Sequence, residues 1–397
     1  MSDSAARRHV RFYGFLRKVI KPYLRVKFCY NAVPAPQLEG PYFVLANHTT
    51  DYDPFMVALS FPQHMYFLAS EHVYRMGFVS RLLGYFLAPI ARVKGGSDLS
   101  AVMDMLRTIR KGHSICFFPE GSRTFNGESC PMTAAAAKLV RKAGVPVVTY
   151  RLTGGYLTSP RWAKELRKGK VTGQVVRVYS AEEVQAMEPE ALADAFNRDL
   201  YVNAFADQKA LHVPYACSAP AEGLEEALYL CPRCHTVGHL RGIGSRFLCD
   251  CGFSCRLDEY GFFQAEGKTE VPFDDILSWD RWQQDELRKL LPGSTETPFF
   301  SDPDFVLNEV DGEHAAWYVC SGTLSLYADH LTIGDSTFAL TDLSGLAIIH
   351  SKGAESLVFS QDTRHFELSS QTNASRSKYY ILYHMLTDSL QSAAKAR

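Results

Sequence analysis

Two kinds of hydrophobic pattern alternate along residues 41–180. Short runs rich in Val, Ile, Phe and Tyr predict buried strands, and segments whose apolar residues recur every three or four positions predict helices. The predicted strands are Tyr42–Ala46, Met65–Ala69, Phe86–Val93, Ser114–Phe118, Val145–Leu152 and Gly173–Tyr179, and the predicted helices are Pro54–Ser60, Leu99–Lys111 and Thr133–Ala143. Such alternation is typical of an α/β layer fold with a mostly parallel sheet, closed here by a helix at about Glu182–Lys209.

The pattern changes after residue 214. Ala, Gly and Pro lead into a cysteine cluster, and from about residue 300 strands follow one another between Gly, Asp and Ser: Trp317–Cys320, Thr323–Tyr327, Leu331–Ile333, Leu343–Ile349, Ser356–Ser360 and His365–Leu368. A terminal helix near Lys378–Leu390 predicts a small β barrel or curled sheet capped by that helix. We therefore expect four regions: a basic helix (1–36), an α/β domain (37–212), a cysteine-rich segment (228–262) and a β-rich domain (300–397).

Composition supports folded domains in a reducing compartment. With 397 residues, 46% hydrophobic and 21% charged, the chain should form two or three globular domains and is not disordered. No apolar run reaches the ~18 residues of a membrane span, and the basic N-terminus lacks the apolar core of a signal peptide. Ten Cys are too few for a disulfide scaffold, and five of them fall within Cys231–Cys255, which indicates a metal.

Positive charge is concentrated in two segments although the net charge is −1. Residues 1–30 carry +7 and residues 151–170 carry +5. From Arg7 to Lys27, apolar and basic residues alternate at helical spacing, which predicts a basic amphipathic helix with a bend at Pro22. Such a helix either packs on its own domain or lies in a membrane interface, and one helix can do both. The charge favours a local anionic surface as partner over nucleic acid.

The segment Asn47–Pro54 follows the strand Tyr42–Ala46 and precedes a helix, where α/β sheets place reactive groups. His48 would accept a proton from a hydroxyl, while Asp53 fixes its tautomer and stabilises the imidazolium. The alternative is that Asp53 is an N-cap followed by Pro54 at the first helical position. Both roles are compatible with one carboxylate.

A second polar segment, Phe117–Arg123, stands at the end of the strand Ser114–Phe118. Its Pro and Gly favour a tight turn that would bring the polar side chains to the same sheet edge as His48. The candidate binding residues here are Glu120, Gly121, Ser122 and Arg123.

Two further cations, Arg92 and Lys94, stand beside another predicted strand end. With Arg123 they would bind a phosphate, Arg as a planar fork and Lys as a point charge. For any one of them the alternative is a solvated surface charge. Three polar motifs on successive strand ends favour the phosphate site.

These segments resemble the glycerolipid acyltransferases of the 1-acylglycerol-3-phosphate acyltransferase type. Asn47–Asp53 looks like their His-x4-Asp block, Ala91–Val93 stands where their Arg-bearing second block falls, Phe118–Arg123 is similar to the third, and Val145–Val148 resembles the fourth. The resemblance covers roughly residues 35–210. Two departures concern substrate choice: Ser122 replaces the usual Thr, and Thr50–Tyr52 replaces a Ser-containing stretch.

The resemblance implies an acyltransferase. His48 would be the general base on the free hydroxyl of lysophosphatidic acid, with Asp53 as its orienting partner. The oxygen would attack the thioester of acyl-CoA or acyl carrier protein, and Arg92, Glu120 and Arg123 would hold the phosphorylated acceptor. Because this acceptor lies in the bilayer, we expect a cytoplasmic protein that is peripheral on the inner face of the membrane. In residues 151–170, interleaved aromatic and basic residues predict a contact at the headgroup boundary.

The cysteine cluster consists of two close pairs separated by fourteen residues, and its members are Cys231, Cys234, Cys249 and Cys251. Two such pairs reach one tetrahedral Zn²⁺ from two knuckles, as in zinc ribbons, and this zinc would be structural. The alternatives are a redox Cys-x-x-Cys motif or a group of buried thiols. Further candidate ligands are His235, His239 and Cys255.

The C-terminal order of strands and helix resembles a pleckstrin-homology or GRAM-like domain, which implies lipid or partner binding. A rival hypothesis makes the whole chain a non-catalytic membrane scaffold or regulatory lipid-binding protein; the presence of both His48 and Asp53 favours the enzyme. Acylation of another lysophospholipid is a further alternative. A nucleic-acid role for the cysteine-rich segment is disfavoured, because few basic residues flank it.

Overall fold

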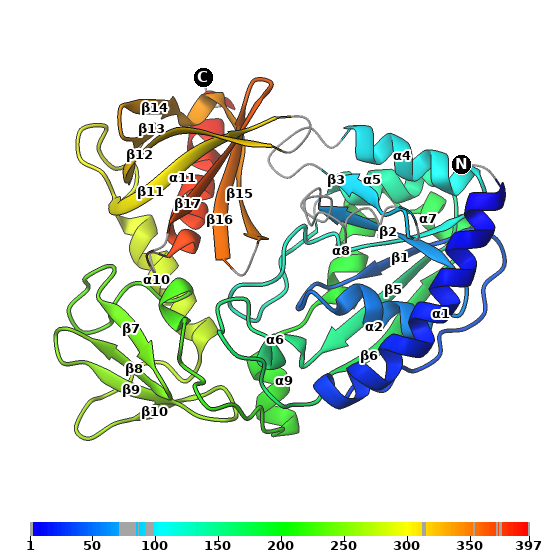
Figure 1. Ribbon diagram of the computed structural model, residues 1–397, viewed down its shortest axis with the longest axis horizontal. Coiled ribbons are helices and arrows are strands. Elements are labelled where there is room, and N and C mark those ends of the chain that lie inside the picture. The colour runs from blue at the N-terminus through cyan, green and yellow to red at the C-terminus, as the bar shows by residue number, and fades with distance from the viewer. Residues whose placement is uncertain are drawn as a thin grey trace. The chain divides into compact units, whose positions relative to one another are not determined.

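The computed structural model describes residues 3–70, 85, 87–92, 99–132, 134–311, 315–351, 354–370, 372 and 375–395 (Figure 1). These residues form two compact units. The first contains the chain up to Arg92, residues 99–220 and the short turn Asp258–Phe262, and the second contains Ala221–Leu257 and the chain from Phe263 onward.

The first unit is built on a six-stranded sheet of order β3-β2-β4-β1-β5-β6. Its strands are β1 (Phe43–Ala46), β2 (Met65–Ser70), β3 (Ile90–Arg92), β4 (Ser114–Phe117), β5 (Val147–Thr153) and β6 (Thr172–Tyr179). The pairs β2–β3, β2–β4, β1–β4 and β1–β5 are parallel, and β5–β6 is antiparallel. The predicted α/β fold with a mostly parallel sheet is therefore confirmed.

Helices cover both faces of this sheet: α1 (Asp3–Phe28), α2 (Asp53–Ser60), α4 (Leu99–Arg110), α5 (Ala134–Ala143), α7 (Ala181–Ala186) and α8 (Pro189–Leu200). Two more helices of this unit, α6 (Gly155–Thr158) and α9 (Ala204–Leu211), lie beyond the sheet. Alternate residues of β1 enter two different apolar clusters, because successive side chains of a strand point to opposite faces. Phe43 and Leu45 pack with α4, α5 and α8, and Val44 and Ala46 pack with α1 and α2. A strand buried on both faces explains the uninterrupted apolar run.

The single helix expected over Glu182–Lys209 is wrong: three helices, α7, α8 and α9, occupy this stretch. Pro189 begins α8, since a residue without an N–H is tolerated in the first turn of a helix but not in its interior. Asn203 begins α9, where its side chain accepts hydrogen bonds from the backbone N–H groups of Phe205 and Ala206.

The N-terminal helix α1 packs on its own domain and runs through Pro22. Leu24 and Phe28 are fully buried, and the Tyr13 hydroxyl donates to the carbonyls of Ala58 and Phe61. The Arg17 guanidinium donates to two carbonyls at the end of α2, at 2.8 and 2.9 Å, where a helix has no intrahelical donors left. Among the described residues no helix is both long and apolar enough to cross a bilayer.

The second unit contains two antiparallel sheets. The smaller has the order β10-β9-β8-β7, from β7 (Leu240–Ile243), β8 (Arg246–Cys249), β9 (Ser254–Leu257) and β10 (Phe263–Ala265). A helix that the sequence pattern did not predict, α10 (Ile276–Lys289), places Trp279 against this sheet. The Trp279 ring is fully buried, its centroid lies 5.2–5.6 Å from those of four Phe rings, and its Nε1–H donates to the Leu230 carbonyl.

The larger sheet has seven strands in the order β14-β13-β12-β11-β17-β16-β15. These are β11 (Phe300–Val310), β12 (Ala316–Leu326), β13 (His330–Ile333), β14 (Ser336–Ala339), β15 (Leu343–Ser351), β16 (Ala354–Gln361) and β17 (Arg364–Ser370), followed by α11 (Arg376–Lys395). The pattern missed β11 and β14 and divided β12 at Gly322, because an isolated Gly within a strand reads as a turn. Consecutive antiparallel strands followed by a terminal helix are present, as expected.

The cysteine-rich segment and the β-rich domain were expected as separate regions, whereas the structure groups them in one unit with α10 between them. Side-chain bonds to backbone connect these parts. Gln283 of α10 donates to the Ala227 carbonyl, and Ser375 and Ser377 at the start of α11 both donate to the Glu226 carbonyl. These bonds join segments far apart in sequence, so no local pattern reveals them.

Replacing Trp279 by Ala should lower the free energy of unfolding of the second unit by about 3–5 kcal/mol, because a large aromatic side chain would leave a cavity. Chemical denaturation monitored by circular dichroism measures this loss. Trp317→Ala is the matched control, since Trp317 is 64% exposed, and its loss should stay within about 0.5 kcal/mol. Equal effects of the two changes would contradict the central role of Trp279.

Candidate functional site

The candidate site lies where β1 and β4 end. These strands are parallel neighbours, with Phe43 opposite Ile115 and Leu45 opposite Phe117. Their carboxyl ends therefore meet at one edge of the sheet, and the segments that follow them emerge side by side. The Thr124 N–H donates to the His48 carbonyl at 3.2 Å, which joins the two segments directly.

His48 and Asp53 form a close pair. The Nδ1 atom of His48 lies 2.9 Å from Oδ2 of Asp53. The Asp53 side chain is fully buried, whereas that of His48 is 21% exposed. The imidazole stacks on the Phe118 ring, with the centroids 4.4 Å apart. A carboxylate at Nδ1 favours the tautomer that carries its proton there and leaves Nε2 able to accept one.

Asp53 is held by other hydrogen bonds besides the one to His48. It accepts from the backbone N–H groups of Thr49 and Thr50, at 2.5 and 2.9 Å, and from both threonine hydroxyls. It is also the first residue of α2, followed by Pro54. The same carboxylate thus organises the turn before the helix and contacts the imidazole. The expectation that Asp53 is the N-cap is wrong: Tyr52 occupies that position without a side-chain cap hydrogen bond, and Asp53 is the first helical residue, so Pro54 stands second.

Asn47 was part of the motif but not a candidate site residue. Its side-chain amide donates to the Leu152 carbonyl at 2.9 Å and its oxygen accepts from the Leu152 N–H at 2.7 Å. These two bonds attach the end of β1 to β5 and set the position from which His48 emerges. The position directly after the strand was visible in the sequence, but the partner was not.

Glu120, in the segment after β4, contacts the segment after β1 that carries His48. One carboxyl oxygen accepts from the His48 backbone N–H and the other from the Cys130 N–H, both at 2.8 Å. Burial raises the pKa of Glu120 to about 8, the two backbone donors oppose that rise, and the nearby Asp53 adds to it. Glu120 therefore positions the backbone of His48, a role that the motif did not predict.

Gly121 and Arg123 follow Glu120 in the same turn. Gly121 adopts a left-handed backbone (φ 74°) and donates its N–H to the Phe118 carbonyl, a conformation that favours glycine. The Arg123 side chain is 9% exposed, and its Nε lies 3.3 Å from Oδ1 of the exposed Asp51. Ser122 is half-buried in this turn.

Of the other two candidate cations, Arg92 ends β3, at the same edge of the sheet as β1. Three strand spacings separate β3 from β1, roughly 14 Å. Lys94 lies outside the described residues. The structure therefore brings His48, Asp53, Glu120 and Arg123 together in the two segments that follow β1 and β4. The strand that ends at Arg92 lies farther along the same sheet edge.

Residues 151–170 were predicted to contact lipid headgroups through interleaved aromatic and basic side chains, and this prediction is wrong for the aromatic ones. Tyr156, Leu157 and Trp162 are buried in the first unit. Arg167 is buried too: its guanidinium lies 5.0 Å from the Trp162 ring centroid and donates to the Pro220 carbonyl. Within this stretch, Gly155 packs against Thr49 of the candidate site. A Cβ at this position would lie 2.1 Å from the Thr49 hydroxyl oxygen, so a side chain does not fit there.

The four cysteines of the cluster come together in the second unit. Their sulfur atoms all lie within 4.8 Å of one another, with 3.7 Å between Cys231 and Cys251 and between Cys234 and Cys249. Zn–S bonds of 2.3 Å in a tetrahedron imply S···S distances of about 3.8 Å, so the four positions fit this ion. The three spare candidates lie elsewhere: Cys255 is buried in β9, His239 contacts Asp250 and His235 contacts Trp282.

Part of the chain matches a model of a known protein family. Residues 26–153 match the family model named Acyltransferase. This span contains β1, β4 and the polar segments after them, so the acyltransferase resemblance of this part of the chain is confirmed.

Two curated relatives from plants are similar to part of this chain. The 1-acyl-sn-glycerol-3-phosphate acyltransferase BAT2, chloroplastic, of Brassica napus is 28% identical over 122 residues, 30% of this chain and 35% of the relative. The 1-acyl-sn-glycerol-3-phosphate acyltransferase LPAT1, chloroplastic, of Arabidopsis thaliana is 25% identical over 122 residues, 30% of this chain and 33% of the relative. The chain thus spans about a third of the length of the curated relatives it matches.

Among solved structures, the 1-acyl-sn-glycerophosphate acyltransferase PlsC of Thermotoga maritima is similar at 18% identity and a TM-score of 0.40. The alignment covers 50% of this chain and 80% of that one.

The raised pKa of Glu120 predicts a pH dependence of stability. The folded protein binds the Glu120 proton up to about pH 8, whereas the unfolded chain loses it near pH 4. The stabilisation is therefore complete below about pH 4 and is lost as the pH rises towards 8, by at most about 1.4 kcal/mol per pH unit.

Glu120→Gln removes this titration, so the stability of the variant relative to the wild type should rise between pH 5 and pH 8. Urea unfolding across that range measures the difference. Glu165→Gln is the matched control, because this carboxylate is exposed. A difference between Glu120→Gln and the wild type that stays constant with pH would contradict the assignment.

Proposed function

We propose that this protein transfers a fatty acyl chain from a thioester donor, acyl-CoA or acyl carrier protein, to the free hydroxyl of 1-acylglycerol-3-phosphate. The observation that carries the proposal is the 2.9 Å pair of His48 and buried Asp53 at the end of β1, within the span that matches the acyltransferase model. The two plant relatives are 1-acyl-sn-glycerol-3-phosphate acyltransferases, which supports the choice of acceptor.

The reaction needs a base but no side-chain nucleophile. Nε2 of His48 accepts the proton of the acceptor hydroxyl while that oxygen bonds to the thioester carbonyl carbon. The tetrahedral intermediate then breaks its C–S bond, and the departing thiolate takes the proton back from His48. The products are the ester and the free thiol, and the imidazole returns to its neutral form.

Asp53 assists without exchanging the proton. Its carboxylate holds Nδ1–H, so the imidazole keeps one tautomer and one orientation, and its negative charge stabilises the imidazolium. The bonds from Thr49 and Thr50 fix the carboxylate in turn. This preorganisation means that little rearrangement is needed when the imidazole becomes charged.

Arg123 is our candidate for the acceptor phosphate. It is nearly buried, lies in the turn next to His48 and contacts an exposed carboxylate, Asp51, which a phosphate would replace as the anionic partner. Gly121 and Ser122 would line this side of the acceptor site, and Arg92 and Lys94 would extend it along the sheet edge. Glu120 holds the His48 loop in position from the interior.

We further propose a cytoplasmic protein that is peripheral on the inner face of the membrane. The acceptor is a bilayer lipid, and α1 combines an excess of cations with exposed apolar side chains. The rival hypothesis of a scaffold without activity is disfavoured by the intact His48–Asp53 pair. The PH/GRAM resemblance of β11–β17 and α11 remains a proposal about lipid or partner binding.

A second proposal concerns the second unit: Cys231, Cys234, Cys249 and Cys251 bind one structural Zn²⁺. The support is the fit of four sulfur positions to a tetrahedral ion. Four thiolates leave no open position for substrate, so the metal would stabilise the two knuckles and take no part in acyl transfer.

Replacing His48 by Ala should reduce acyl transfer by about 10²–10⁴-fold, because the general base is lost. Transfer of labelled acyl chains from acyl-CoA and from acyl carrier protein to lysophosphatidic acid measures this, with circular dichroism to verify folding. His239→Ala is the control, since this exposed histidine belongs to the second unit. Turnover of His48→Ala at the wild-type rate would refute the mechanism.

Purified wild-type protein should contain one equivalent of zinc, and Cys234→Ser with Cys251→Ser should contain almost none. Elemental analysis measures this, and Cys320→Ser should retain the metal because Cys320 lies on β12, outside the cluster. The knuckles should become sensitive to protease, while far-ultraviolet circular dichroism changes little, because Trp279 still holds the small sheet. A disulfide among these cysteines in freshly reduced protein, or wild-type protein free of zinc, would refute the site.

A further inference from the structure

The first half of α1 carries arginines that the described chain leaves without acidic partners. From Ser4 to residue 38 the sequence contains no Asp or Glu. Within the described residues, no carboxylate forms an ion pair with Arg7, Arg8 or Arg11. Arg7 and Arg11 stand four residues apart, so they are neighbours on the helix, and such like-charged pairs destabilise a helix by a few tenths of a kcal/mol.

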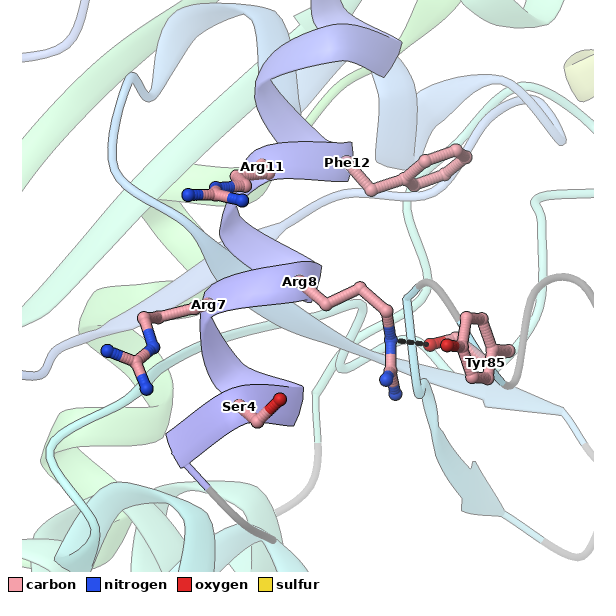
Figure 2. Close-up of a pocket in the computed structure, with 6 residues that line it drawn as sticks. All are labelled: Ser4, Arg7, Arg8, Arg11, Phe12 and Tyr85. Carbon is pink, nitrogen blue, oxygen red and sulfur yellow. Dashed lines mark hydrogen bonds between the residues drawn. The ribbon is translucent and has the colours of Figure 1, made fainter.

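These arginines line a cavity. It has a volume of about 620 Å³ and is lined by Ser4, Arg7, Arg8, Arg11, Phe12 and Tyr85. Figure 2 shows Arg7 and Arg11 extending from one side of the helix and Arg8 and Phe12 from the other, with Tyr85 facing Arg8. The cavity therefore lies along this face of the helix, with Arg7 and Arg11 at one side and Arg8 and Phe12 at the other.

One wall of this cavity is held in place. The Nε of Arg8 donates to the Tyr85 carbonyl at 3.1 Å, and its guanidinium carbon lies 3.7 Å from the Tyr85 ring centroid. His9, the next residue, contacts the same carbonyl at 3.2 Å and the Tyr66 hydroxyl at 3.1 Å. A guanidinium fixed through Nε keeps its other N–H donors for a ligand, and less entropy is lost when a ligand binds.

The donor set identifies the ligand class. Guanidinium groups form paired hydrogen bonds to phosphate oxygens, and the Ser4 hydroxyl adds a further donor. An anion between Arg7, Arg8 and Arg11 would also relieve their mutual repulsion. The cavity therefore suits a phosphate group.

The surroundings of the cavity favour a lipid over a free phosphate. Phe12 lines the cavity, and Phe15, Val19 and Val26 continue along the same side of α1 at helical spacing, 60, 54 and 79% exposed. A phosphate group at the start of such an apolar row matches a lipid headgroup with its acyl chains beside the helix.

We propose that the cavity lined by Arg7, Arg8 and Arg11 binds the phosphate headgroup of an anionic membrane lipid. This site holds one headgroup at one place on α1, and it differs from a diffuse attraction of all the basic residues to a charged surface. It goes beyond the proposed acyl transfer and does not depend on it, since none of its residues belongs to the His48 site.

The test compares two double variants of the full-length protein on phosphatidylcholine vesicles with and without phosphatidic acid. Arg7→Gln with Arg11→Gln removes two charges from the cavity, and Lys18→Gln with Arg25→Gln removes two from the same helix outside it. All four side chains are exposed, so both variants should fold, which thermal unfolding verifies. The cavity variant should lose at least about tenfold more affinity for the phosphatidic acid vesicles than the control variant.

Equal losses of vesicle affinity in the two variants would overturn the proposal, because they would show attraction by charge alone.

Two further measurements separate a lipid from a free phosphate. Inorganic phosphate should not displace the wild-type protein from vesicles, and Phe15→Ser with Val19→Ser should weaken vesicle binding. Displacement of the wild type by inorganic phosphate at concentrations that leave the cavity variant bound would identify a free-phosphate site and also overturn it. His48→Ala protein should bind vesicles like the wild type, so this test is independent of the catalytic proposal.

Discussion

The parallel pairing of β1 with β4 is the constraint on which the candidate site depends. It places the carboxyl ends of two strands, separated by about seventy residues of sequence, next to each other at one sheet edge. His48 and Glu120 then need only short extensions to meet, and Glu120 completes the connection by accepting the His48 N–H. The two faces of β1 bury large apolar clusters, so the edge is held by the core of the unit.

Buried polar groups are the second determinant. Asp53 accepts hydrogen bonds from Thr49, Thr50 and His48, and the Asn47 side chain bonds both the backbone N–H and the backbone carbonyl of Leu152. A buried carboxylate or amide without partners costs several kcal/mol, so each of these groups specifies one local geometry. His48 is thereby held by three contacts. Asp53 contacts its Nδ1 atom, Glu120 accepts from its backbone N–H, and the Phe118 ring stacks on one face of its imidazole.

The second unit shows a different balance. The small sheet β7–β10 buries its aromatic side chains around Trp279 of α10, so it does not rely on the cysteines alone for its packing. The cysteine knuckles lie at the end of this sheet, where Gly252 adopts a left-handed backbone and turns the chain back after Cys249. Apolar packing and metal ligation would thus act on different parts of one small domain.

The sequence by itself determined the elements whose signals are local. Apolar runs located the central strands, helical spacing located α1, and the cysteine spacing identified four residues that the structure brings within 4.8 Å. The His48–Asp53 pair was also within reach, because five residues across a strand end and a first helical turn leave few geometries. The tertiary structure alone decided the role of Glu120, the partner of Asn47, the helix α10 and the burial of Tyr156 and Trp162. Each of these depends on contacts between segments tens of residues apart, and a linear pattern carries no information about which distant backbone group a side chain will meet.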